Sequence, residues 1–158
     1  MIYIGIGSNI GNRKKNIEKA KFLLLENGIN INKSSNFYES LSWPDIKKPK
    51  FLNIVIQIDT NFSPKKCLEI FRSIEIKLGR KKTKKNAPRT CDIDIISNNK
   101  KISSGDIKLP HIRMHKRNFV LIPLLELDKN WSHPKTKKSI EKLIISLPIK
   151  DITSIKQI

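Results

Sequence analysis

The chain has 158 residues, of which 32 are Lys or Arg and 14 are Asp or Glu, so its formal net charge is +18. This length suits one domain with a substantial hydrophobic core, and we expect a single domain over residues 1–158. The sequence has neither an apolar run of the ~18 residues that a membrane span needs nor a signal-peptide pattern. Cys67 and Cys91 lie in apolar surroundings without a C-x-x-C partner, which predicts reduced, packed cysteines. These features predict a cytoplasmic protein that has no membrane partner, and we expect it to be a monomer.

The excess of positive charge first suggests a nucleic-acid partner. The lysines, however, are spread along the whole chain, and Ile and Asn are also abundant, which is typical of a low-GC genome. A nucleic-acid surface usually clusters its charges and interleaves them with aromatic side chains. We therefore interpret most lysines as solvated surface residues and expect no specific nucleic-acid partner.

The elements follow one another in a recognisable order. Residues 2–6 read as a strand, 13–26 as a helix capped by Asn12 and ended by Gly28, and 29–38 and 51–60 as two further strands. Ser63 and Pro64 begin a helix that runs to residue 78, and residues 90–97 form the fourth strand. The order βαββαβ is typical of the α+β ferredoxin-like sandwich, an antiparallel sheet with helices on one face. A turn region, a loop through Pro110 and helices at 118–127 and from about 139 then form a C-terminal helical extension.

Two connections, residues 39–50 and 81–88, are long and lack regular patterning. Long loops in a compact domain are commonly lids or binding loops, so both are candidates for loops that close over a site.

The stretch APRTCDIDII places two carboxylates inside an apolar run. On a strand Asp92 and Asp94 point to one face, while Cys91, Ile93 and Ile95 point to the other. Neighbouring carboxylates repel each other unless a cation lies between them. Carboxylates at this spacing can bracket two magnesium ions ~4 Å apart, an arrangement that serves phosphoryl transfer.

Arginine is informative in a chain that otherwise favours lysine. Four of its few arginines, Arg80, Arg89, Arg113 and Arg117, fall in the same part of the chain as the aspartates. The planar guanidinium binds pairs of phosphate oxygens, which lysine does not do as well. Arg80 also suits the C-terminus of the preceding helix, where a positive charge is favourable.

Two other motifs give weaker signals. GIGSNIG fails the dinucleotide fingerprint because Ile10 stands where a glycine is needed, and it reads better as a strand end whose small residues admit a flat ligand or another backbone. His111 and His115 have the i, i+4 spacing of a zinc pair, but no third ligand lies in register. Contact of His111 with a phosphate is the better hypothesis.

Motifs over nearly the whole chain resemble one family. GSNIGNR, FYES, FLN, EIKLGR, APRTCDID, LPH and KRNFVLIPLLE occur in order, as in 6-hydroxymethyl-7,8-dihydropterin pyrophosphokinase of the folate pathway. The resemblance implies the ferredoxin-like fold and an ATP-dependent diphosphotransferase. Such an enzyme would move the β- and γ-phosphates of ATP together onto the pterin hydroxymethyl oxygen and release AMP.

The resemblance also implies roles for individual residues. Asp92 and Asp94 match the ligands of two Mg²⁺ ions and, with Arg80 and Arg89, the catalytic group. The residues matching ATP contacts are Glu75, Arg80, Arg89, Ile95, His111 and Arg117, with Ile95 against the adenine. The residues matching pterin contacts are Ser40, Leu41, Trp43, Phe51, Asn53 and Phe119, with the two phenylalanines stacking on the faces of the ring and Asn53 hydrogen-bonding to it.

The chain departs from the family pattern at several loop positions. Asn86 or Lys85 stands where an aromatic residue is often found, and Ala87 replaces a glycine. Ile112 replaces a tyrosine and Leu41 a proline. These departures bear on loop closure and nucleotide contacts more than on the chemical step.

Two other interpretations remain at this point. A βαββαβ module can bind RNA, but it would need aromatic motifs on its central strands, and the third strand offers only Phe51 at its start. A metal-dependent nuclease would use the same D-x-D pair.

Overall fold

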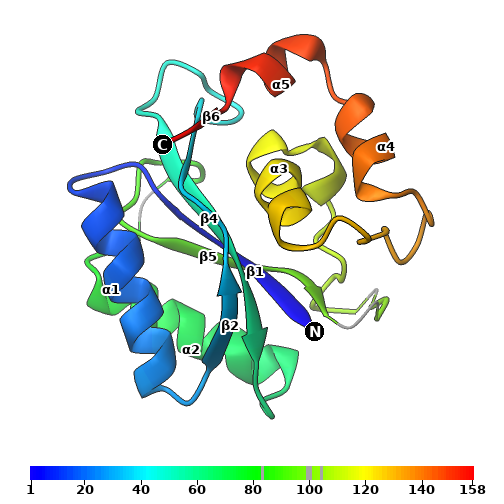
Figure 1. The fold of residues 1–158 in the computed structure, drawn as a ribbon. Coiled ribbons are helices and arrows are strands. Elements are labelled where there is room, and N and C mark those ends of the chain that lie inside the picture. Colours follow the sequence, from blue (N-terminus) through cyan, green and yellow to red (C-terminus); the bar gives the residue numbers. More distant parts are fainter. Residues whose placement is uncertain (83, 99–100, 104) are drawn as a thin grey trace.

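The computed structural model describes residues 1–82, 84–98, 101–103 and 105–158. Its centre is a six-stranded sheet in which every pair is antiparallel (Figure 1). The main order is β5 (Asp92–Asn98), β1 (Ile2–Ser8), β4 (Phe51–Asp59), β3 (Tyr38–Ser40) and β6 (Lys156–Gln157), and β2 (Asn30–Ser34) also pairs with β4. The first and last strands of the βαββαβ unit are thus neighbours, which confirms the predicted ferredoxin-like arrangement.

Two helices cover one face of the sheet (Figure 1). Helix α1 (Arg13–Glu26) begins at Asn12, whose side chain accepts a hydrogen bond from the Lys15 backbone N–H. Helix α2 (Pro64–Lys77) begins at Ser63, which caps Lys66 in the same way. Both predicted caps are therefore confirmed. The core beneath the helices is apolar and includes the two cysteines, which are free and buried as predicted.

The C-terminal extension covers the opposite face, so helices lie on both sides of the sheet rather than on one (Figure 1). It consists of a short 3-10 helix (Met114–Lys116), α3 (Asn118–Leu127), α4 (Ile140–Ile145) and α5 (Ile149–Ser154). Tyr3, Val55 and Ile96 from the sheet pack against α3 and α4 in a second core. The predicted last helix is divided into α4 and α5 at Pro148, because a residue before proline avoids the helical conformation. No helix in the described ranges is long and apolar enough to cross a membrane.

The predicted strand at 29–38 is interrupted. Ser35 leaves the regular ladder and bonds Val55 through both its backbone N–H and its hydroxyl. The Glu126 carboxylate of α3 accepts hydrogen bonds from the backbone N–H of Asn36 and the hydroxyl of Tyr38. A side chain from a distant helix thus takes the place of a strand partner here. The predicted connection at 39–50 consequently begins at Leu41.

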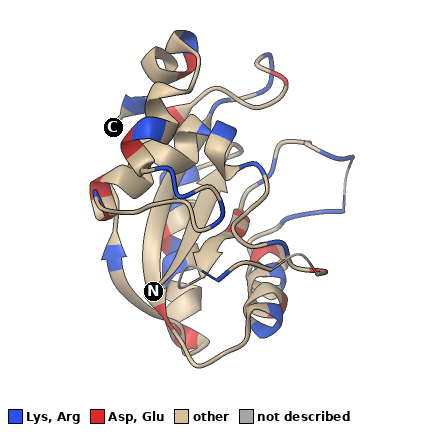
Figure 2. Cartoon of the chain, turned by 90° about the vertical axis from the view of Figure 1, so that its right-hand side faces the viewer, with Lys and Arg blue, Asp and Glu red and all other residues tan. Residues whose placement is uncertain are grey.

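The predicted loop at 81–88 contains residue 83, and the predicted turn after the fourth strand contains residues 99, 100 and 104, all outside the described residues. Elsewhere Lys and Arg are scattered over helices and loops rather than gathered on one element (Figure 2). This distribution agrees with the interpretation of most lysines as surface residues.

Candidate active site

The two aspartates lie on the face of β5 that points away from α1 and α2. In the ladder Asp92 is opposite Gly7 and Asp94 opposite Gly5, while the intervening Ile93 is buried in the helical core. The neighbouring Gly5 and Gly7 carry no side chain that would stand between the aspartates and the rest of this face. This arrangement confirms the alternation that the sequence predicted.

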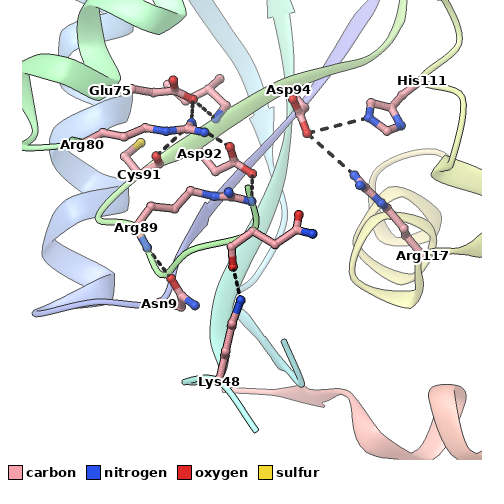
Figure 3. Close-up of polar contacts among 12 residues, drawn as sticks. Asn9, Lys48, Glu75, Arg80, Arg89, Cys91, Asp92, Asp94, His111 and Arg117 are labelled. Atoms are coloured by element: carbon pink, nitrogen blue, oxygen red, sulfur yellow. Dashed lines mark hydrogen bonds and ion pairs between the residues drawn. The ribbon is translucent and has the colours of Figure 1, made fainter. Parts of the chain in front are cut away.

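Asp92 is held by two arginines (Figure 3). Its Oδ1 lies 2.8 Å from Arg80 Nη1, and its Oδ2 lies 3.1 Å from Arg89 Nη2. The same Arg80 nitrogen is 2.6 Å from Glu75 Oε1, which also accepts a hydrogen bond from the Ile93 backbone N–H. Burial raises the pKa of Glu75, although that N–H and Arg80 oppose the shift. Charge on Asp92 is therefore balanced by guanidinium groups, and Arg80 belongs to the site rather than acting only as a helix-terminal charge.

Asp94 is less well paired. Its Oδ2 lies 3.7 Å from Arg117 Nη1 and 3.9 Å from His111 Nε2 (Figure 3). Desolvation, followed by the repulsion from Asp92, raises the pKa of Asp94 to about 6. Because 45% of its side chain is still exposed, solvent can reach the carboxylate and a ligand can approach it. Asp94 is thus a carboxylate whose neighbouring arginines do not offset burial and the repulsion from Asp92.

His111 is oriented by the backbone. Its Nδ1 accepts a hydrogen bond from the Arg113 backbone N–H, so the neutral ring carries its proton on Nε2, the atom nearest Asp94. Burial, with the charges of Arg117 and Arg113, lowers the pKa of His111 to about 4. His111 can therefore donate a hydrogen bond into the cleft at neutral pH without being charged.

Aromatic residues and a buried amide form the other part of the same cleft. Phe51, Asn53, Phe119 and Trp43 line it together with Asp92, Asp94, Arg89, His111 and Arg117. The Asn53 side-chain N–H₂ donates to Ser40 Oγ at 3.0 Å and to the Tyr38 carbonyl at 3.3 Å. Neither bond uses the Asn53 carboxamide oxygen, which is left for a ligand.

Gly7 forms the tight floor of this part. A methyl group there would lie 3.1 Å from Asn53 Oδ1 and 3.3 Å from the Phe51 ring, so only glycine leaves both side chains in place. The interpretation of the GSN segment as a place of close approach is consistent with this geometry.

The arginines also lie against the aromatic rings. Arg89 is 5.7 Å from the centre of the Phe51 ring, and Arg117 is 5.5 Å from that of Phe119. Trp43 lies 5.5 Å from Arg113 and 5.8 Å from Arg117. The Nε atoms of Arg89 and Arg117 are buried and have no hydrogen-bond partner among the described residues. Buried donors of this kind are costly unless a ligand satisfies them.

Some residues named from the sequence do not line this cleft themselves, although Arg80 reaches it through its contact with Asp92. Ile95 is 6% exposed and packs in the core beneath α1 and α2, and Leu41 is exposed. Glu75 and Arg80 instead line a second groove with Lys81, Lys82, Lys84 and Lys85, which meets the cleft at Asn86 and Arg89. His115 lies beside His133 rather than paired with His111 on a helix. The roles that the resemblance assigns to Ile95, Leu41, Glu75 and the other named site residues stay predictions.

Sequence reasoning missed the residues that join the loops. Asn9 accepts a hydrogen bond from the Arg89 backbone N–H at 2.8 Å and donates to the Pro49 carbonyl at 3.1 Å. Lys48 Nζ donates a hydrogen bond to the Asn86 carbonyl at 2.8 Å (Figure 3). This bond joins the loop before β4 directly to the loop before β5. The only available signal was the position of Asn9 directly after the first strand in the GSN motif.

The carboxylates suit magnesium better than zinc. In the described part of the chain, no three His, Cys, Asp or Glu side chains gather as a metal-binding group. Mg²⁺ commonly uses one or two carboxylates and completes its shell with water and substrate phosphates. Asp94, with its raised pKa and open face, fits such an ion, and Asp92 fits it once an arginine moves to a phosphate.

Fold and cleft together define an α+β ferredoxin-like protein whose carboxylates and arginines suit a polyphosphate. The sequence model of the family described as 7,8-dihydro-6-hydroxymethylpterin-pyrophosphokinase (HPPK) matches residues 3–129. The chain belongs to this family. Since its members are enzymes, the RNA-binding interpretation gains no support.

Individual relatives show the same likeness. The chain is 37% identical over 142 residues to the 2-amino-4-hydroxy-6-hydroxymethyldihydropteridine pyrophosphokinase of Aquifex aeolicus (strain VF5), covering 89% of this chain and 88% of that protein. It is 39% identical over 140 residues to the folic acid synthesis protein fol1 of Pneumocystis carinii, covering 88% of this chain but 19% of that longer protein. A crystal structure of an HPPK-DHPS in complex with substrates has a TM-score of 0.74 over 99% of this chain and 46% of that one. At 14% identity, this last likeness concerns the fold.

Proposed function

We propose that the chain transfers the diphosphate group of ATP to 6-hydroxymethyl-7,8-dihydropterin and releases AMP, a step of folate biosynthesis. Family membership and the names of the relatives support this activity. The observation that carries it is the shared cleft, in which an aspartate pair with arginines adjoins two phenylalanine rings and the Asn53 amide. Polyphosphate and flat heterocycle would thus bind side by side.

In the reaction, the hydroxymethyl oxygen attacks the β-phosphorus and loses its proton to solvent. A new bond forms between these two atoms, the bond from the β-phosphorus to the oxygen shared with the α-phosphate breaks, and AMP leaves. Arg80, Arg89 and Arg117 would bind the phosphate oxygens, and His111 would donate a neutral hydrogen bond. The pterin ring would stack between Phe51 and Phe119, with its edge against Asn53, Ser40, Leu41 and Trp43.

Asp92 and Asp94 would hold two Mg²⁺ ions. When bound, these ions would offset the negative charge of the triphosphate. The protein would then release Arg80 and Arg89 from Asp92 so that both can bind the phosphates. Their present ion pairs with Asp92 hold the two guanidinium groups close to the proposed phosphate site. The adenine contact of Ile95 and the nucleotide-side position of Glu75 belong to the same proposal.

The test is a mixture of the protein, ATP, Mg²⁺ and the hydroxymethyl pterin, assayed for AMP against ADP. AMP is expected only when the pterin and Mg²⁺ are both present. Release of ADP, or hydrolysis of ATP without the pterin, would falsify the pyrophosphokinase assignment.

A further inference from the structure

Arg113 stands beside the proposed phosphate site. In the part of the chain that the structure describes, no carboxylate forms an ion pair with it. Its side chain is exposed, and its backbone N–H fixes the His111 ring. The charge of Arg113 lies near enough to lower the pKa of Arg117, together with the larger effect of burial. The positive charge of Arg113 thus lies next to the neutral His111 ring and the Arg117 guanidinium, which both face Asp94.

The guanidinium of Arg113 is held by an aromatic ring instead. Trp43 lies 5.5 Å from it and 5.8 Å from Arg117, so a single indole attracts two like charges at the edge of the cleft. A cation–π contact at an exposed site is weaker than a charge-assisted pair of hydrogen bonds to phosphate. An arriving polyphosphate is therefore the better partner for both guanidinium groups.

We propose that Arg113 is a further polyphosphate-binding residue, held at the edge of the cleft by Trp43 until a nucleotide triphosphate binds. The inference rests on the proposed function. It adds a binding residue at the end of the cleft where His111 and Arg117 already lie. It also assigns an anionic partner to Arg113, the one arginine in this region that forms no ion pair with a carboxylate of the described residues. Trp43 belongs to the loop on the pterin side, so the same contact connects that loop to the phosphate site.

The choice of arginine supports this role. The chain has 32 basic residues and uses lysine for most of them, yet it places arginine at 113 and lysine three positions later at 116. A surface position that needed only charge would be served by lysine. Arg113 and Lys116 are both exposed, but only Arg113 contacts an aromatic ring of the cleft. Lys116 is therefore a matched control for the loss of one positive charge.

Calorimetric titration of a non-hydrolysable ATP analogue in the presence of Mg²⁺ tests the inference. Relative to the wild type, Arg113→Gln should raise the dissociation constant roughly ten- to a hundredfold, which corresponds to losing a hydrogen bond between charged groups. The dissociation constant of Arg113→Lys should lie between those of the wild type and Arg113→Gln. Lys116→Gln should change the dissociation constant by no more than roughly twofold. Equal affinities of Arg113→Gln and Lys116→Gln would overturn the proposal.

A second measurement follows the ring itself. The chain has two tryptophans, and Trp131→Phe leaves Trp43 as the reporter. Saturation with the analogue should change the fluorescence emission of Trp43. Unchanged emission would overturn the proposal that Trp43 holds Arg113 until the nucleotide binds. The AMP assay on the wild type decides the proposed function separately. A wild type that binds the analogue but makes no AMP would contradict the proposed function. The affinities of the variants would still show whether Arg113 binds the polyphosphate.

Discussion

The guanidinium of Arg89 lies 5.7 Å from the centre of the Phe51 ring, while Arg117 lies 5.5 Å from that of Phe119. Arg89 and Arg117, both proposed for the triphosphate, thus each face an aromatic ring proposed for the pterin. The two substrates would compete with the protein's own contacts for the same groups. Phosphate would draw the arginines away and free the ring faces for stacking.

From this relationship we expect the nucleotide to strengthen pterin binding. Pterin affinity, measured by calorimetry, should rise at least roughly tenfold when a non-hydrolysable ATP analogue and Mg²⁺ are present. AMP is the control, since it lacks the β- and γ-phosphates and should leave the arginines on the rings. Equal pterin affinity with the analogue and with AMP would contradict the coupling.

Replacing the same arginines by lysine should not be conservative. Arg89→Lys and Arg117→Lys keep the charge but lose the second parallel hydrogen bond and the planar orientation. We expect turnover at saturating ATP and pterin to fall roughly ten- to a hundredfold in each, equivalent to ~1.5–3 kcal/mol.

Arg13→Lys is the control for this series. Arg13 lies outside the cleft, where it pairs with Glu39 at 2.8 Å, a contact that lysine can keep. Turnover of Arg89→Lys and Arg117→Lys at the Arg13→Lys level would show that the forked geometry is not used, whatever the reaction.

Local signals in the sequence were enough for most of the fold. Alternation, the caps at Asn12 and Ser63 and the order of the elements predict the sheet and the first two helices, because these depend on nearby residues. The break that begins at Ser35 depends on the hydrogen bond from the Asn36 backbone N–H to Glu126. These two residues are 90 positions apart in the chain, so no local sequence pattern predicts the contact. The same holds for the packing of α3 and α4 on the second face of the sheet.

The candidate site divides in the same way. The D-x-D spacing and the arginine bias point to Asp92, Asp94, Arg80, Arg89 and Arg117, and the structure brings these side chains together. The link through Asn9 could not be predicted, because its partners Pro49 and Arg89 come from loops 40 and 80 positions away. Strand alternation does place Ile95 on the face opposite the aspartates, and in the structure Ile95 packs in the core while Ile96 lines the cleft.

The link at Asn9 gives a third prediction. Asn9 is 4% exposed, and Asn9→Ala removes the side-chain hydrogen bonds to the Pro49 carbonyl and the Arg89 backbone N–H, both of them partly buried. We expect the free energy of unfolding, measured with urea, to fall by about 1–3 kcal/mol. The Michaelis constants for both substrates should also rise, since both loops lose an anchor.

Asn12→Ala is the matched control for Asn9. It removes a helix cap and should cost about 1 kcal/mol, but it contacts neither loop. Michaelis constants that change equally in the two variants would mean that Asn9 acts through stability alone.

The fourth prediction separates the two aspartates without metal. Asp92 pairs with Arg80 and Arg89, so Asp92→Asn should lower the free energy of unfolding by about 1–3 kcal/mol. Asp94 differs, because burial and Asp92 raise its pKa to about 6 from an ordinary value of 3.8. Asp94→Asn should therefore stabilise the metal-free protein at pH 8, by less than about 1 kcal/mol because the partly exposed carboxylate is screened by solvent.

The pH dependence gives the sign of the Asp94 effect. Between about pH 4 and 6 the folded state keeps a proton that the unfolded state has lost, so this group's contribution to stability falls as the pH rises through that window. The advantage of Asp94→Asn should be small at pH 4, develop up to pH 6 and stay constant above it. Urea unfolding in EDTA at pH 4, 6 and 8 measures this course.

With Mg²⁺ added at pH 8, the wild type should gain stability and both aspartate variants should gain less, while the turnover of the variants falls by several orders of magnitude. If either variant were as active as the wild type at saturating Mg²⁺, that aspartate could not be a required metal ligand.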